Sequence, residues 1–197
     1  MQKLSTRLAG VLAVALSAAL PGAVAADTTY VTDQGHTEVM FGWSHAGVTE
    51  QNGEFTKATG TLTMADNLED SSITVEIDAN SVSSGFDALD EHLKSADFLD
   101  VEKYPTLTFT STEVVSTGDN TMDVTGDLTI HGVTQPVTLK AIMTLQGEHP
   151  LGKNFEYYQG EWVGLKATTE IDHQAFEVGA FSTGPIKITI NSELKAK

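Results

Sequence analysis

The chain has 197 residues and no cysteine, and its 27 Asp and Glu outnumber its 11 Lys and Arg, which gives a formal net charge of −16. This length fits one globular domain with a sizeable core. The lack of cysteine excludes disulfides, thiol nucleophiles and cysteine-based metal sites. A surface this acidic repels phosphate backbones and anionic lipid headgroups, so we expect no nucleic acid as a partner.

Residues 1–25 have the three parts of an export signal. Lys3 and Arg7 are basic, residues 8–20 form an uncharged apolar run, and a small-x-small sequence ends at Ala25. The run is shorter than the roughly 20 residues that cross a bilayer, so we expect a cleaved signal peptide, no stable membrane insertion and a periplasmic location. Its removal leaves residues 26–197 as one domain, with nine lysines against 27 acidic residues, a net charge of −18 and no arginine.

The rest of the chain alternates apolar and polar residues, which is typical of strands that bury one face. The alternation is clearest over residues 73–80, 122–130, 137–145, 163–171 and 186–190, and strands are also expected at 36–44, 54–65 and 105–115. Turn sequences at 118–120 and 131–133 predict antiparallel hairpins. Eight such strands can close into an up-and-down barrel or stack as a two-sheet sandwich, and periodicity alone does not separate these folds.

One segment departs from the strand pattern. Four apolar residues recur at helical spacing: Phe86, Leu89, Leu93 and Ala96. Acidic residues in the first turns suit the positive end of a helix dipole. The spacing predicts one short helix over residues 87–95 (Asp87 to Ser95), which either docks on the outside of the barrel or covers the mouth of a cavity.

Catalytic and metal-binding motifs are missing from the sequence. Residues 42–46 lack the last glycine of a nucleophile elbow and fall in an expected strand. The histidines form no close ligand pair on one element: His36, His45, His92, His131, His149 and His173. We therefore expect no catalytic residues, no metal and no cofactor.

Three segments resemble the YceI family of periplasmic isoprenoid-binding proteins. Residues 98–109 (FLDVEKYPTLTF) are similar to the family signature, residues 126–137 (GDLTIHGVTQPV) to its hairpin, and HLKS at 92–95 to the motif before the signature. The N-terminal strand pair of the family is matched by His36, Val39, Phe41, His45, Gly53, Phe55 and Gly60. The resemblance implies an all-β fold, an eight-stranded antiparallel lipocalin-like barrel, whose lumen holds an isoprenoid or similar lipid without catalysis.

Strand parity indicates which residues face that lumen. On the apolar parity of their strands lie Phe41, Trp43, Leu107, Phe109, Leu128, Ile130, Leu139, Met143 and Leu165. From the helix we expect Phe86, Leu89 and Leu93 at the cavity rim. Small residues on the same faces either leave space for a ligand or pack against large neighbours: Ala58, Gly60, Gly126, Ala141 and Ala167.

The chain departs from the family pattern at residues 173–177, which read HQAFE where relatives often have RxDFG. Without arginine no guanidinium fork can hold a phosphate, so we expect a neutral headgroup, such as a quinone, on an isoprenoid lipid. His173 shares strand parity with Leu165 and Ile171 and is a candidate partner of that headgroup, although a surface position past the strand end is also open.

Two alternatives to a lipid carrier remain open from the sequence. An enzyme acting on a lipid in the same cavity needs a carboxylate or histidine beside a second polar group, with His45 or His173 as candidates. A structural or stress protein needs only a filled barrel. The sequence also leaves a homodimer open.

Overall fold

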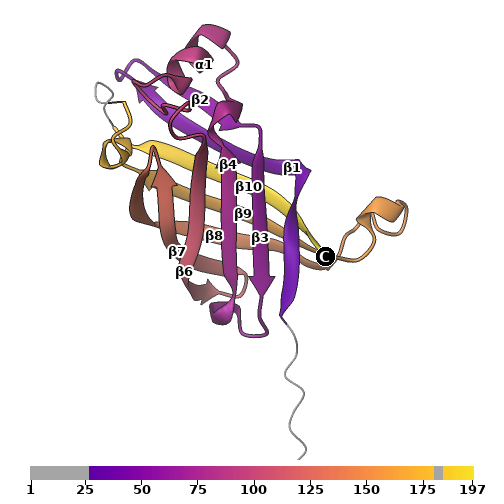
Figure 1. The fold of residues 1–197 in the computed structure, drawn as a ribbon. Coiled ribbons are helices and arrows are strands. Elements are labelled where there is room, and N and C mark those ends of the chain that lie inside the picture. Colours follow the sequence, from indigo (N-terminus) through magenta and orange to yellow (C-terminus); the bar gives the residue numbers. More distant parts are fainter. Residues whose placement is uncertain (1–26, 180–183) are drawn as a thin grey trace, which may run out of the picture.

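Ten strands and one α-helix make up the part of the chain that the structure, a computed structural model, describes: residues 27–179 and 184–197 (Figure 1). The strands are β1 (Thr28–His45), β2 (Thr49–Phe55), β3 (Ala58–Met64), β4 (Ser72–Asp78), β5 (Val82–Ser83), β6 (Thr106–Gly118), β7 (Thr121–Ile130), β8 (Val133–Glu148), β9 (Glu161–Ile171) and β10 (Ile186–Ala196). Helix α1 spans Asp87–Lys94, and short 3₁₀ turns include η1 (Leu68–Asp70), η2 (Ala79–Ser81), η3 (Glu156–Tyr158) and η4 (His173–Phe176). The expected signal peptide lies outside the described residues.

Eight of the strands close into an antiparallel barrel, which decides between the barrel and the sandwich. Their order is β1-β3-β4-β6-β7-β8-β9-β10, and β10 pairs again with β1. Closure leaves none of these eight strands with a free edge along its whole length. The remaining strands, β2 and β5, extend the sheet at the end of the barrel where α1 lies (Figure 1).

The single strand expected at 54–65 is wrong, because the structure divides it into β2 and β3. Residues 56 and 57 turn away from β1 and bond to η2 instead. The amide of Thr56 donates to the Ser81 carbonyl and that of Lys57 to the Ser81 hydroxyl, both over 3.1 Å. As a result β2 pairs with the C-terminal half of β1 and β3 with its N-terminal half.

Strand β1 carries a bulge where the barrel closes. Thr32 pairs with Leu194 and Thr37 with Ser192, so residues 33–36 of β1 stand opposite the single residue Glu193 of β10. A bulge of this kind bends the strand and increases its twist. The sequence predicted β1 only from residue 36, because polar residues interrupt the alternation at the bulge.

The predicted helix is confirmed as α1, which ends one residue earlier than expected, at Lys94. Its first turn is attached to the chain after β5: the amide and hydroxyl of Ser84 donate to Asp90 Oδ1 over 2.6 and 2.5 Å. No helix within residues 27–179 and 184–197 is long and apolar enough to cross a membrane.

Candidate ligand-binding cavity

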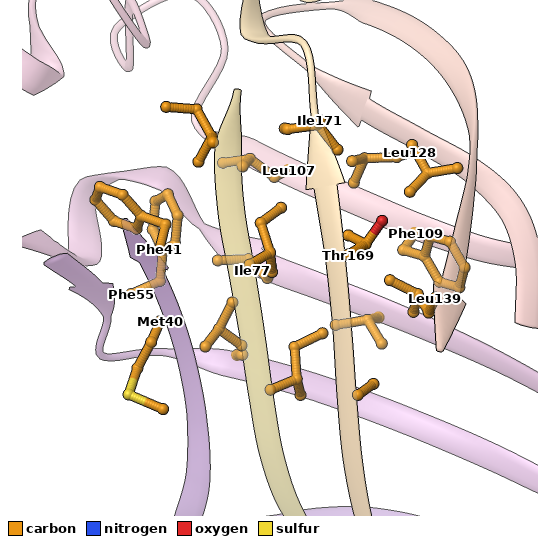
Figure 2. A pocket seen from close by; sticks show the side chains of 18 of the residues that line it. Met40, Phe41, Phe55, Ile77, Leu107, Phe109, Leu128, Leu139, Thr169 and Ile171 are labelled. Atoms are coloured by element: carbon orange, nitrogen blue, oxygen red, sulfur yellow. The ribbon is translucent and has the colours of Figure 1, made fainter. Parts of the chain in front are cut away.

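A cavity of about 810 Å³ runs inside the barrel. Its volume lies in the range typical of small-molecule sites. Figure 2 shows apolar side chains from several strands pointing into it, among them Phe41, Phe55, Ile77, Leu107 and Phe109. No Asp, Glu, Lys or Arg of the described residues lines the cavity. The wall therefore suits a long apolar ligand and disfavours a charged one, because an unpaired charge in such a wall loses its hydration.

Eleven of the twelve residues that the sequence places at the site line this cavity: Phe41, Trp43, Leu89, Leu107, Phe109, Leu128, Ile130, Leu139, Met143, Leu165 and His173. Strand residues among them reach the lumen because side chains alternate between the two faces of a sheet. The placement in the wall is structural, and binding by these residues stays a prediction.

Phe86 is the exception, because it does not line the cavity. It is the N-cap of α1, with extended backbone angles, and its side chain is 67% exposed and outside the cavity wall. Because an N-cap residue precedes the helical turns, its side chain need not follow the stripe formed by Leu89 and Leu93. Those two residues do line the cavity.

Some wall residues were missed by the sequence reading. Ile77 and Ile188 lie on predicted strands and could have been found by extending the same parity. Phe176 and Val178 lie in and after η4. They carry no periodic signal, because a 3₁₀ turn and its irregular continuation impose no alternation. Only the path of the chain after β9 places them against the cavity.

The small residues divide into two groups. Ala58, Ala141 and Ala167 line the cavity, whereas Gly126 does not. A Cβ on Gly126 would lie 2.5 Å from Cζ of Phe109 and 2.5 Å from the Thr110 carbonyl oxygen. Gly126 therefore serves close packing under an aromatic ring, while the alanines leave space in the lumen.

His173 is buried in the cavity wall rather than placed on the surface. Its residue exposure is 5%, and it begins η4 directly after β9. Nδ1 lies 2.6 Å from the carbonyl oxygen of Val178. Nε2 is shielded from solvent and has no hydrogen-bond partner among the described residues. This is the one buried polar side chain of the wall with such an unused atom in that part of the chain.

Helix α1 and η4 lie at the same end of the barrel. The start of β6, which follows α1, pairs with the end of β7 through Thr108 and Thr129. The start of β8 pairs with the same end of β7, and β8 in turn pairs with β9 ahead of η4. The polar wall residues Ser44, His45, Gln51 and His92 belong to the β1–β2 hairpin and α1, so the wall histidines lie at this end, whereas the wall serines Ser71 and Ser72 lie directly before and at the start of β4, away from it.

A second group of titratable side chains lies away from the cavity, at the β1 bulge. Asp33, His36 and Glu193 bring potential metal-ligand atoms within 4.8 Å of one another, the one such group in the described ranges. His36 Nδ1 is 2.7 Å from Asp33 Oδ2. Burial raises the pKa of Asp33, but hydrogen bonds from His36 and Gly35 outweigh it and hold this pKa below its usual value. The pKa of His36 is raised, chiefly by its bond to Asp33.

A sequence profile of the YceI-like domain matches residues 30–196. The chain belongs to the YceI-like family. It is 41% identical over 170 residues to a UPF0312 protein of Pseudomonas putida, covering 84% of this chain and 85% of the relative. It is 38% identical over 167 residues to a UPF0312 protein of Vibrio parahaemolyticus, with the same shares of both chains.

Solved structures share the fold of this YceI-like chain. BcnA of Burkholderia cenocepacia aligns with a TM-score of 0.70 and 22% identity, over 82% of this chain and 98% of BcnA. A polyisoprenoid-binding domain from Saccharophagus degradans aligns with a TM-score of 0.64 and 12% identity, over 87% of this chain and 99% of that domain. At these identities the similarity establishes the barrel fold and does not identify the ligand.

Proposed function

We propose that this chain binds an isoprenoid-type lipid, a quinone or polyprenyl derivative, in the barrel cavity and carries or sequesters it in the periplasm. The observation that carries the proposal is a cavity of about 810 Å³ without a charged wall residue in the described part of the chain. Membership of the YceI-like family and the similar fold of a polyisoprenoid-binding domain support it.

The energetics of the cavity favour a hydrocarbon chain. Burial of a methylene group is worth about 0.8 kcal/mol, so each prenyl unit that leaves water contributes several methylene equivalents. Part of this gain is lost because binding orders the ligand. A chain of several units therefore binds through the apolar wall, and the few polar groups near α1 select its headgroup.

The wall chemistry supports binding rather than catalysis. An acid–base reaction on the lipid needs a titratable group beside a second polar group. No carboxylate of the described residues lines the cavity. The only hydrogen bond of the His173 side chain in those residues goes to a backbone carbonyl. The other two wall histidines, His45 and His92, are exposed at the α1 end, where water is not excluded. The proposal therefore assigns no chemical step to this site.

The test is to purify the protein from its native host, extract it with organic solvent and identify the lipid by mass spectrometry. We expect a stoichiometric isoprenoid species in the extract. Ala141→Phe, which fills the lumen, should lose that species when purified in parallel. An extract without lipid from the unaltered protein overturns the proposal, and conversion of added lipid to a product would favour the enzyme. Recovery in the periplasmic fraction checks the location.

A further inference from the structure

We infer that the preferred lipid donates a hydrogen bond from a hydroxyl group to Nε2 of His173, as a prenyl alcohol or a quinol does and a quinone carbonyl or an ether does not. This inference rests on the proposed function and specifies its headgroup. It narrows the expectation that His173 is the partner of a neutral headgroup, such as a quinone. The decisive feature is the position of the proton on the imidazole ring.

The hydrogen bond of Nδ1 fixes that proton. A backbone carbonyl oxygen only accepts, so at 2.6 Å from the Val178 oxygen Nδ1 must be the donor. In a neutral imidazole the other nitrogen then carries a lone pair. Nε2 of His173 is therefore an acceptor and offers nothing to a second acceptor such as a carbonyl group.

The surroundings favour the neutral ring. His173 is 5% exposed, and no carboxylate of residues 27–179 and 184–197 lies within ion-pair distance of it. An imidazolium here would bury a charge without a counterion and leave a second N–H without an acceptor, and both are costly. The chain offers the ligand a lone pair at this position.

The unused lone pair of Nε2 is energetically unfavourable, because it is a buried acceptor without a hydrogen-bond donor in the described part of the chain. Buried polar atoms nearly always have a partner, because one that is left unpaired forfeits its bond to water. Nε2 has none among the described residues. Since His173 forms part of the cavity wall, a hydroxyl group in the cavity can supply the missing donor once the ligand displaces the side chains that cover Nε2.

The position of His173 also orients the ligand. η4 lies at the α1 end of the barrel, together with the polar wall residues Ser44, His45, Gln51 and His92, and the wall beyond it is mainly apolar, its polar members there being serines and threonines such as Ser71 and Ser72. A lipid whose hydroxyl meets Nε2 extends its chain away from α1 into the apolar part. One hydrogen bond and a long apolar wall then recognise the two parts of the molecule separately.

The test compares farnesol with its methyl ether, which keeps the chain and the oxygen atom but lacks the donor. Delipidated full-length mature protein is titrated with each probe by calorimetry. We expect farnesol to bind about fivefold or more tightly, the effect of one net hydrogen bond to a buried acceptor. The ¹⁵N resonance of Nε2 should shift with farnesol and stay in place with the ether.

Matched variants separate Nε2 from the rest of the ring. In His173→Asn the side-chain amide can still donate to Val178 and Nε2 is gone, so the preference for farnesol should disappear while the ether binds as before. In His173→Gln an amide oxygen can reach the Nε2 position and restore part of the preference. His131→Asn is the control, because His131 has a buried unpartnered nitrogen but lies outside the cavity wall, and asparagine tolerates its positive φ of 54°.

The outcomes are distinguishable. Equal affinity of the unaltered protein for both probes overturns the headgroup inference and leaves lipid binding intact. Tight binding of neither probe overturns the proposed function, and the inference with it. A preference that survives in His173→Asn assigns the hydroxyl to another wall residue and overturns the role of Nε2. The resonance measurement needs no variant, so a misfolded variant does not decide the result.

Discussion

Single small residues decide where the lumen is open and where it is filled. Ala141 lies in the cavity wall on β8, and its methyl group leaves the lumen open. Gly126 of β7, which pairs with Val137 of β8, lies under the Phe109 ring and has no room for a side chain. A large residue at Gly126 would disrupt β6–β7 packing, so of these two residues Ala141 is the one suited to a test that fills the cavity.

Ala141→Phe should abolish lipid binding without unfolding the barrel. The new ring projects into the lumen and occupies space that the ligand needs, while overpacking costs about 1–3 kcal/mol of stability. We expect at least a tenfold loss of farnesol affinity by calorimetry and an unchanged β-type circular dichroism spectrum. Ile142→Phe is the control, because Ile142 is the next residue of β8 and is 48% exposed. Unchanged affinity in a folded Ala141→Phe protein would contradict the assigned cavity.

At the scale of elements, α1 is attached by few contacts and stands at the cavity end. None of its residues is fully buried, although Leu89 and Leu93 contribute to the wall. The two hydrogen bonds from Ser84 to Asp90 tie its first turn to the chain after β5. Elements with few buried contacts open at low free energy. These features favour a rim role for α1 over simple docking.

Amide hydrogen exchange should report this role. We expect residues 87–94 to exchange faster in the delipidated protein than with farnesol bound, since the ligand covers Leu89 and Leu93. Asp90→Asn should accelerate exchange further, because a neutral amide accepts more weakly than a carboxylate. Asp119→Asn, in the β6–β7 turn, is the control and should leave α1 unchanged. Equal protection of α1 with and without lipid would reduce the helix to a docked element.

Acidification should loosen α1 before the barrel. Hydrogen bonds from the Ser84 hydroxyl and then from its amide hold the pKa of Asp90 below its usual value. This folded pKa is lower than the unfolded one, so the stabilisation is complete above about pH 4 and is lost as the pH falls through the folded pKa. Exchange of residues 87–94 measured at descending pH, corrected for intrinsic rates, should rise in that window. Asp90→Asn should show no such rise.

At the scale of the whole molecule, closure of the barrel separates an acidic surface from an uncharged lumen. Closure between β1 and β10 encloses the lumen, and the 27 carboxylates stay out of the described cavity wall. After removal of the expected signal, residues 26–197 contain no arginine. An anionic headgroup then meets general repulsion outside and no charged partner in the described wall.

Farnesyl pyrophosphate should therefore bind more weakly than farnesol, although the two have the same chain. Calorimetry at low and physiological salt should show the pyrophosphate improving as salt screens the repulsion, with farnesol little affected. Tighter binding of the pyrophosphate at physiological salt would contradict the expectation of a neutral headgroup and indicate lysine contacts at the mouth of the cavity.

The sequence by itself determined which strand residues face the lumen and where the helix lies. An inward face of a barrel must be apolar and an outward face tolerates polar residues, so period-2 alternation is enough to place Phe109, Leu128 and Leu139. Helix α1 could also be predicted from local sequence, because helical spacing and acidic residues in the first turn are both visible within nine residues. Closure into a barrel was implied only by resemblance, since the pairing of β1 with β10 joins the two ends of the domain.

Only the tertiary structure decided the contacts of residues whose partners lie far along the chain. Residues 56 and 57 leave the sheet because their amides form hydrogen bonds to Ser81. Gly126 has no room for a side chain because the Phe109 ring from β6 lies over it. His173 becomes a buried acceptor because η4 brings Val178 to its Nδ1. Local patterning sets the direction of a side chain, whereas the identity and distance of its neighbours depend on how distant segments pack.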